Sequence, residues 1–399
     1  MIEISELSKN LPFSSIRKLV PLADAAAKRG TKVYRLNMGQ PDIDSPREAL
    51  DAVKNNKLTI VSYPHSAGNE SFRKGLAGYY KTLGIDLDYS EIIVTVGGSE
   101  ALHIALTICC NPGDEVIVFE PFYTNYNTFA VLCGIKLVAV PTSIETGFEL
   151  PPMSEVEKYI TPKTKAVLLN NPGNPTGTLY SREELLELGK IVKAHNLFLL
   201  SDEVYREFCY SEAPHFSCMN IPDIDQQVVL IDSVSKRYSL CGVRIGNLAS
   251  HNKEVMAAVL KFAQARLCAP EYGQIAAEGA LATPASYFAA VKAEYIARRN
   301  LMVDLLNKIP GVYAPMPMGA FYTVASLPVD DAEKFVRWML EEFTYNGATV
   351  NVTPAAGFYA DKSKGHNQVR VAYVLKKEDI KAALTCLAKA LEHYPGRTL

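Results

Sequence analysis

Short apolar runs alternate with longer amphipathic segments through the middle of the chain. The runs that read as strands are Ile92–Val96, Glu115–Phe119, Lys136–Val140, Lys165–Leu169, Phe198–Leu200 and Val228–Ile231. Several of them are apolar throughout, which is typical of parallel strands that are covered by helices on both faces. Between two of these runs, residues 181–196 open with a capping-box pattern and carry apolar residues at helical spacing. This strand–helix–strand order predicts an α/β fold with an open, mainly parallel, helix-covered central sheet.

The C-terminal part of the chain has a different pattern. It predicts a long charged helix at about residues 286–308, an apolar stretch at Gly319–Leu327, a helix at Asp331–Tyr345, strands within 348–354 and 368–374, and a closing helix at Lys377–His393. This pattern indicates a smaller α+β unit. Near the start, a helix is expected at Ser14–Lys28. We therefore expect an N-terminal segment (1–45) that packs with a small C-terminal domain (291–399), and a large domain (46–290) that contains the sheet.

Composition and charge exclude several classes of protein. The chain has 399 residues, of which 48% are hydrophobic and 21% charged, so it can bury a sizeable core. Its 41 Lys and Arg nearly balance 43 Asp and Glu, which argues against a nucleic-acid partner. No apolar run is long enough to span a membrane, and the acidic start does not resemble a secretory signal, so we expect a cytoplasmic protein. The cysteines and histidines lack metal-site spacing, so reduced thiols and no metal are expected.

Candidate chemistry follows the predicted strands, because ligands of open α/β sheets bind at the carboxyl ends of the strands. After the first run, Gly97–Leu102 can present backbone N–H groups to a phosphate, although the same pattern suits an ordinary strand–helix turn. After the second run, Tyr123 is either an aromatic platform or a residue that fills space at the rim. The sequence NNPGNPTG at Asn170–Gly177 predicts a rigid turn.

The last two runs are followed by charged residues. The run Phe198–Leu200 is followed by the segment SDEVY, in which Asp202 is equally a helix N-cap or a group that faces a ligand. Residues 232–247 then bring together two serines, Lys236 and Arg244, a set that suits a phosphate dianion. Pyridoxal phosphate needs all these groups, since its aldehyde requires a lysine amine and its pyridinium nitrogen an acidic partner.

The motifs NNPGNPTG, SDEVY and SVSKRYSLCGVRIG occur in an order and at separations that resemble the class I aminotransferases. The resemblance runs from Leu36–Asp42 to Gln368–Val374 and is nearest to bacterial aspartate aminotransferases. It implies the fold of that family (fold type I), pyridoxal 5'-phosphate as cofactor in the large domain, and a homodimer with shared active sites. It also implies a ping-pong transfer of an amino group between an L-amino acid, with aspartate as first hypothesis, and a 2-oxo acid such as 2-oxoglutarate.

The resemblance implies a role for each matching residue around the cofactor. Lys236 forms the Schiff base and moves the proton at the substrate Cα, and Asp202 pairs with the pyridine nitrogen. Tyr205 and Asn174 bind the phenolic oxygen, and Tyr123 stacks on the ring. The phosphate is expected to bind Ser99, Glu100 through its backbone, Ser233, Ser235 and Arg244, together with Tyr63 from the neighbouring subunit.

For the substrate, the resemblance implies that Arg370 clamps the α-carboxylate with a bidentate fork, with Gly39 and Asn174 beside it. Taken alone, Arg370 would also suit a surface charge at a strand edge. A dicarboxylic substrate needs a second cation, for which Arg266 is a candidate, although it also fits an arginine on a helix surface.

Other functions remain open on the sequence alone. Aromatic, alanine and kynurenine-type amino acids are alternative substrates. A C–S β-lyase would use the same lysine, aspartate and tyrosine, and a regulator could bind the cofactor without turnover. A nicotinamide dehydrogenase ranks last, because no predicted strand is followed by G-x-G-x-x-G.

Overall fold

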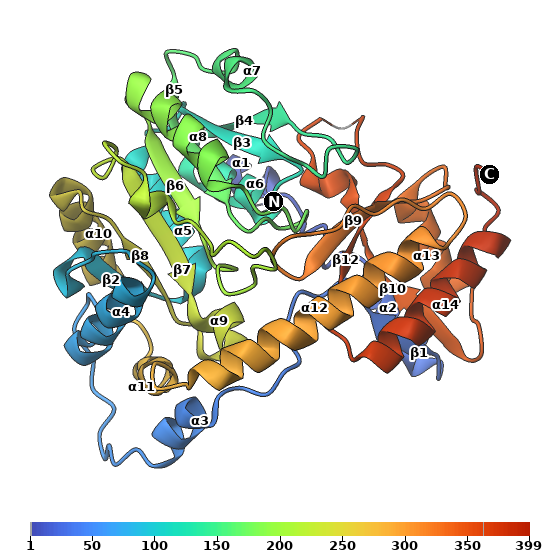
Figure 1. Cartoon of the computed structure of the whole chain (residues 1–399), viewed down its shortest axis with the longest axis horizontal. Coiled ribbons are helices and arrows are strands. Elements are labelled where there is room, and N and C mark those ends of the chain that lie inside the picture. The colour runs from blue at the N-terminus through green and yellow to red at the C-terminus, as the bar shows by residue number, and fades with distance from the viewer. Residues whose placement is uncertain (1, 362) are drawn as a thin grey trace.

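The computed structural model describes residues 2–361 and 363–399. Its larger part is built around a seven-stranded sheet (Figure 1). Its strand order is β2-β8-β7-β6-β5-β3-β4. The strands are β2 (Ile92–Thr95), β3 (Glu115–Glu120), β4 (Lys136–Pro141), β5 (Thr164–Asn170), β6 (Phe198–Asp202), β7 (Val228–Ser233) and β8 (Gly246–Ala249). Only the pairs that involve β8 are antiparallel, so the predicted mainly parallel sheet is confirmed. The sequence did not predict β8, because GNLA contains no apolar run.

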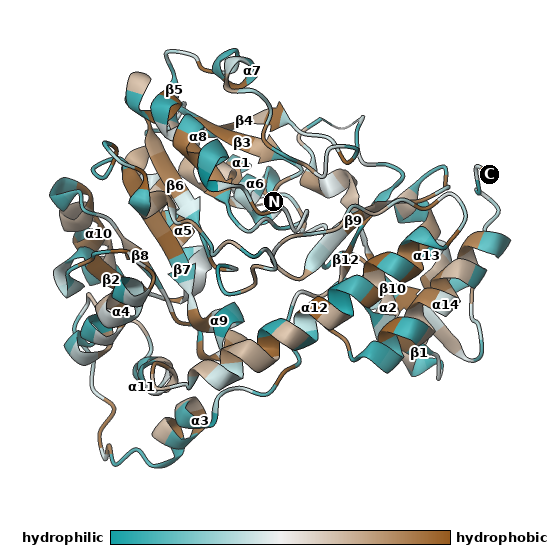
Figure 2. Ribbon diagram, viewed as in Figure 1, coloured by the Kyte–Doolittle hydropathy of each residue, from teal (hydrophilic) through white to brown (hydrophobic). Residues whose placement is uncertain are grey.

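Both faces of this sheet are buried, which explains why its strands are apolar throughout. Side chains alternate along each strand, so Val116 and Val118 pack with one core cluster while Ile117 and Phe119 pack with another. The first cluster is completed by α5 (Gly97–Cys109), α6 (Asn125–Cys133) and α10 (Lys253–Arg266), and the second by α4 (Glu70–Thr82) and α8 (Arg182–Ala194). In Figure 2 the central strands are accordingly among the most hydrophobic segments.

The smaller part is built from both ends of the chain. Strand β1 (Lys32–Arg35) pairs in parallel with β10 (Ala348–Asn351), and β11 (Thr353–Pro354), β12 (Gln368–Ala372) and β9 (Tyr322–Ser326) form an antiparallel sheet. These strands share a core with α2 (Val20–Lys28), α13 (Ala332–Glu341) and α14 (Lys377–His393). The closing helix has its predicted limits, and the parallel pair supports the predicted packing of the N-terminal segment on the C-terminal domain.

One long helix, α12 (Ala285–Asn307), links the two parts (Figure 1). Its residue Phe288 packs against the core of the large sheet, whereas Tyr295, Met302 and Leu306 belong to the core of the smaller part. The expected domain boundary at residue 290 falls inside this helix. The change of core along the helix supports the division, which remains a prediction.

The structure corrects the prediction of a helix at Ser14–Lys28, because α2 starts only at Val20. Pro21 has no N–H to donate to a carbonyl one turn earlier, so it belongs in the first turn of a helix. Residues 14–18 instead form a turn in which Ser14 O accepts hydrogen bonds from the N–H groups of Arg17 and Lys18. The helix predicted at Asp331–Tyr345 is also shorter, because Asp331 caps it and it ends at Glu341.

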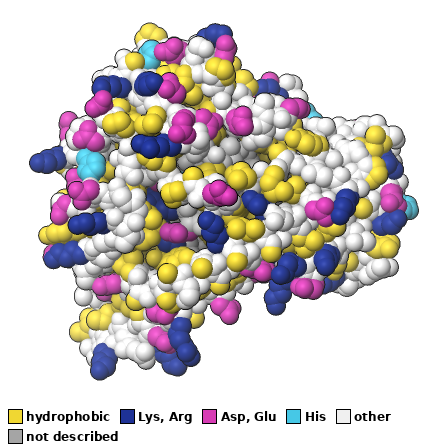
Figure 3. Space-filling model, in the orientation of Figure 1, with side chains coloured by type: hydrophobic (Ala, Val, Ile, Leu, Met, Phe, Trp, Pro, Cys, Tyr) yellow, Lys and Arg dark blue, Asp and Glu magenta, His cyan; other side chains and the backbone are white. Residues whose placement is uncertain are grey.

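Shorter helices complete the fold. They are α1 (Glu6–Lys9), α3 (Arg47–Lys54), α7 (Met153–Glu157), α9 (Val234–Arg237) and α11 (Glu271–Ala280). No helix among the described residues is long and apolar enough to cross a membrane. On the face shown in Figure 3, basic side chains are interspersed with acidic ones.

Close backbone packing brings β8 against the start of α5. A Cβ built on Gly246 would lie 2.7 Å from the backbone nitrogen of Gly98 and 2.7 Å from the backbone oxygen of Asp232. Glycine is therefore needed at this position for steric reasons, since neither neighbour is the end of a flexible side chain.

We expect Gly246→Ala to destabilise the protein by about 1–3 kcal/mol, because the added methyl group must push two backbone segments apart. The matched control is Gly242→Ala, just before β8, where an added Cβ meets nothing within 4 Å. Thermal unfolding of the two variants measures the difference. Equal melting temperatures would contradict the predicted close packing.

Candidate active site

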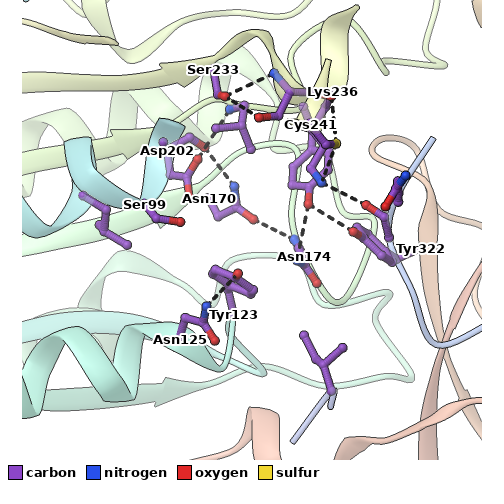
Figure 4. A pocket seen from close by; sticks show the side chains of 18 of the residues that line it. Ser99, Tyr123, Asn125, Asn170, Asn174, Asp202, Ser233, Lys236, Cys241 and Tyr322 are labelled. Atoms are coloured by element: carbon purple, nitrogen blue, oxygen red, sulfur yellow. Dashed lines mark hydrogen bonds between the residues drawn. The ribbon is translucent and has the colours of Figure 1, made fainter. Parts of the chain in front are cut away.

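A cavity of about 570 Å³ lies at the carboxyl ends of the central strands (Figure 4). Most of the residues singled out in the sequence line it. They are Gly39, Ser99, Tyr123, Asn174, Asp202, Tyr205, Ser233, Ser235, Lys236, Arg244 and Arg370. Three of the candidate residues, Glu100, Tyr63 and Arg266, are not among the residues that line it.

Lys236 is held on the short helix α9, directly after β7. The side chain of Ser233 accepts a hydrogen bond from the backbone N–H of Ser235 at 3.1 Å and so caps this helix. The Lys236 Nζ donates to the backbone oxygen of Gly39 at 2.9 Å and lies 3.8 Å from the Cys241 sulfur. The amine is thus positioned between a strand end of the sheet and the N-terminal segment.

A buried charge network fixes β7, the strand that leads into the helix with Lys236. Asp232, in β7, accepts hydrogen bonds from Arg237 and from the hydroxyl of Tyr80, and lies 3.8 Å from Arg206. These side chains are buried, and the two guanidinium groups keep the pKa of Asp232 below its usual range despite the burial. The negative charge of Asp232 is therefore compensated within the fold by the two arginines.

Asp202 is buried as well, but without such compensation. Its carboxylate accepts hydrogen bonds from the Tyr126 hydroxyl at 2.9 Å and from the Val204 N–H at 3.4 Å. Burial raises the pKa of Asp202 to about 7. Residues 204–207 form a turn rather than a helix, so the interpretation of Asp202 as a helix N-cap is wrong. A buried carboxylate that faces a cavity fits a cationic ring nitrogen as its partner.

Hydrogen-bond donors that suit a phosphate line the part of the cavity where α5 begins. The Arg244 backbone is left-handed (φ 57°, ψ 50°), and its guanidinium lies so close to Gly97 that a Cβ there would be 2.5 Å from Nη2. Arg244 therefore reaches the helix N-terminus that Ser99 belongs to. Helix N–H groups, an arginine and the hydroxyls of Ser233 and Ser235 together form a suitable set of donors for a phosphate.

Glu100 and Arg266 form an ion pair beside this region rather than in the cavity. The Glu100 carboxylate accepts from the Val96 N–H at 2.7 Å and from Arg266 at 2.9 Å. Arg266 also donates to the backbone oxygens of Ser66 and Val94. Its side chain is only 13% exposed. Arg266 is therefore neither a surface arginine nor a residue that lines the cavity, because the end of α10 packs against the start of α5.

Arg370 lies in β12, on the side of the cavity formed by the smaller part. It is 1% exposed, so the interpretation as a surface charge is wrong. Its guanidinium donates to Asn174 Oδ1 at 2.9 Å and to the backbone oxygen of Asn37 at 2.6 Å, and its Nε has no partner among the described residues. Burial lowers the pKa of Arg370. A carboxylate ligand would supply the charge that its neutral partners do not.

Hydroxyl and amide groups connect the two sides of the cavity. Asn174 donates to the Tyr205 hydroxyl at 3.4 Å, and that hydroxyl lies 3.1 Å from the hydroxyl of Tyr322. In Figure 4, Tyr123 and Asn125 lie across the cavity from Ser233 and Lys236.

Sequence reasoning missed several of the residues that build the site. Tyr322 stood in the apolar stretch Gly319–Leu327, to which no function was assigned, and Asn37 and Tyr126 were not singled out. The cavity is also lined by residues that were not singled out individually, namely Ser14, Ile16, Arg17, Met38, Gln40, Asn125, Asn170, Val204 and Cys241, and by Gly98 and Leu102 from the predicted phosphate-binding stretch Gly97–Leu102. For Asn170 a signal existed, since it opens the rigid turn.

Tyr63 lies away from the cavity in an exposed apolar segment. Its side chain is 80% exposed, and Ile60 and Val61 beside it are 75% and 54% exposed. Within this single chain, Tyr63 therefore makes no contribution to the site.

Comparison with known proteins identifies the family. The family model for aminotransferase class I and II matches residues 31–387. The chain is 31% identical to an aspartate aminotransferase of Geobacillus stearothermophilus, covering 91% of this chain and 92% of that protein. It is also 31% identical to aromatic-amino-acid aminotransferase 2 of Thermococcus litoralis, covering 95% and 96%. The structure of aspartate aminotransferase from Thermus thermophilus with maleate matches with a TM-score of 0.89 at 28% identity, covering 98% of this chain and 100% of that one. The chain thus belongs to the class I and II aminotransferases and is a pyridoxal-phosphate-dependent transaminase with the aspartate aminotransferase fold.

Proposed function

We propose that this aminotransferase transfers an amino group between L-aspartate and a 2-oxo acid such as 2-oxoglutarate, in a ping-pong reaction. The observation that carries the proposal is the buried Arg370 guanidinium, which lines the same cavity as Lys236 and has only neutral hydrogen-bond partners. Two of the similar proteins are named aspartate aminotransferases, and one of them was solved with maleate, a dicarboxylate.

The cofactor would lie between the sheet and the smaller part. Asp202 would hold the pyridine nitrogen protonated, Tyr205 and Asn174 would bind the phenolic oxygen, and Tyr123 would cover the ring. The phosphate would be held by Ser99, Ser233, Ser235, Arg244 and the Glu100 backbone. When bound, pyridoxal phosphate supplies the aldehyde that takes up the amino group and a ring that withdraws electrons from the substrate Cα.

The protein's own groups orient the substrate and move its proton. Arg370, supported by Asn174, would fix the α-carboxylate, with the backbone of Gly39 beside it. Fixing the carboxylate directs the Cα–H bond towards Lys236, whose amine takes that proton as a general base. Lys236 Nζ donates to the Gly39 oxygen at 2.9 Å, which holds the base next to the backbone expected beside the substrate carboxylate.

We further propose a homodimer in which Tyr63 reaches the phosphate in the neighbouring subunit. The exposed apolar segment that includes Ile60, Val61 and Tyr63 supports this assembly, because such a patch is a typical protein interface. The cytoplasmic location remains a prediction from the sequence.

A steady-state panel of amino donors with 2-oxoglutarate tests the substrate. We expect aspartate to have the highest kcat/KM, with alanine and the aromatic amino acids lower by about tenfold or more, because they lack the second carboxylate. A panel in which aspartate is inactive while an aromatic amino acid or alanine reacts would refute the aspartate assignment.

Lys236→Ala should lower turnover by about 10³-fold or more, because it removes the general base and the amine that binds the cofactor. The variant should also lose the visible absorption of the bound cofactor. Lys261→Ala, an exposed position on α10, is the control for loss of a lysine. Normal absorption and turnover in Lys236→Ala would exclude Lys236 from the proposed role.

The pKa of Asp202 predicts a pH dependence of stability in the cofactor-free protein. Burial raises this pKa from 3.8 to about 7, so folding favours the protonated carboxyl group. The corresponding stability is present below the unfolded value and is lost as the pH rises through about 7. From about pH 5 to about pH 8, the wild type should therefore lose stability relative to Asp202→Asn, since other groups titrate alike in both proteins. Parallel melting temperatures across this range would contradict the assignment of a buried, uncompensated carboxylate.

A further inference from the structure

Arg17 lines the active-site cavity and has no role in the reaction proposed above. It lies in the turn before α2, and it lines the cavity together with Ser14 and Ile16. Its side chain is exposed, so it stands at the mouth of the cavity rather than within the core.

Contacts of the neighbouring residues place this turn on the Arg370 side of the cavity. Arg370 donates to the backbone oxygen of Asn37, and the Asn37 side chain donates to the backbone oxygen of Ile16 at 3.4 Å. Ile16 also packs against the cluster that contains Phe358, whose ring centre is 5.2 Å from the Arg370 guanidinium carbon. Arg17 is therefore the next residue after Ile16, whose contacts hold it near Arg370.

Electrostatics agree with this placement. Burial raises the pKa of Tyr123 to about 12, and the positive charges of Arg370 and Arg17 both oppose that rise. Arg17 is therefore near enough to the aromatic wall of the cavity for its charge to act there. Arg244 is not among the groups that affect Tyr123 most, which is consistent with its place at the phosphate end.

Arg17 also differs from the other cations of the cavity in its partners. Lys236, Arg244 and Arg370 each donate to oxygen atoms of the chain. The Arg17 guanidinium makes no hydrogen bond or ion pair with any residue in the described ranges 2–361 and 363–399. Its donors are free to bind a ligand.

We propose that Arg17 binds the distal, side-chain carboxylate of a dicarboxylic amino acid while Arg370 binds the α-carboxylate. This inference rests on the proposed function, since it concerns the substrate of the same site. A substrate held between Lys236 and Arg370 extends its side chain within the part of the cavity that the N-terminal turn lines. There a planar guanidinium can bind a carboxylate with two parallel hydrogen bonds. Arg17 is then the residue that selects dicarboxylic over monocarboxylic substrates.

The test compares single-turnover half-reactions of the holoenzyme with L-aspartate and with norvaline, which lacks the distal carboxylate. Arg17→Met should lower the apparent second-order rate constant for aspartate by about 10- to 100-fold, the loss expected for a charge-assisted hydrogen bond. The rate constant for norvaline should stay nearly unchanged. Arg17→Lys should recover part of the loss, because it keeps the charge without the fork.

Lys18→Met is the matched control, because Lys18 is the next residue in the same turn but forms an ion pair with Glu333 on α13. It should behave as the wild type with both donors. A binding measurement supplements the kinetics: the Kd of succinate should rise by about 10- to 100-fold in Arg17→Met, whereas that of butyrate should not.

The possible outcomes separate the two proposals. An unchanged aspartate reaction in Arg17→Met, or an equal loss with aspartate and norvaline, would overturn the role of Arg17 and leave the aspartate assignment intact. A wild-type enzyme that reacts with norvaline but not with aspartate would overturn both the substrate assignment and the role of Arg17. Loss of the aspartate reaction alone, with a normal Lys18→Met variant, would support the inference.

Discussion

The active site depends on two hydrogen bonds of one buried arginine. Arg370 in β12 donates to Asn174, in the turn after β5, and to the backbone of Asn37, which follows β1. These contacts join the C-terminal sheet, the central sheet and the N-terminal segment. Because the guanidinium is buried, the loss of either partner would leave an unsatisfied buried donor and destabilise the folded protein. The cavity is therefore complete only when all three segments are packed together, and this packing fixes the position of the Arg370 guanidinium relative to Lys236.

The site also buries an acidic and a basic side chain that have no partner of opposite charge among the residues that the structure describes. Asp202 has hydroxyl and backbone N–H partners, and Arg370 has amide and backbone oxygen partners. The nearby Asp232 is different, since Arg206 and Arg237 compensate its charge within the fold. Burying an uncompensated charge costs several kcal/mol, and a ligand of opposite charge recovers part of that cost. Cofactor and substrate should therefore stabilise the folded protein as well as react in it.

The sequence predicted the residues that stand directly after strands better than those that reach the site from elsewhere. Strand ends share one edge of a parallel sheet, so the prediction of an open α/β sheet was enough to single out Asp202 and Lys236. The family resemblance then added Arg370, whose strand lies in a different sheet. Tyr126, Asn37 and Tyr322 were missed, because they meet the site only through tertiary packing. Arg266 was assigned to the wrong surroundings for the same reason: its partner Glu100 is far away in the chain, and only the packing of α10 on α5 brings them together.

Proteins with this fold and about the same identity to the chain carry the names of different amino-acid substrates, so the machinery at the sheet edge cannot by itself determine the substrate. Selection must come from residues that touch the substrate but do not hold the cofactor. The turn before α2 is suited to both conditions, since it lines the cavity and lies outside the central sheet. Its conformation follows from Pro21, which cannot continue a helix towards the N-terminus. The same proline that makes α2 shorter than its periodicity predicts therefore leaves Arg17 in a turn at the cavity, where its guanidinium is available to a substrate.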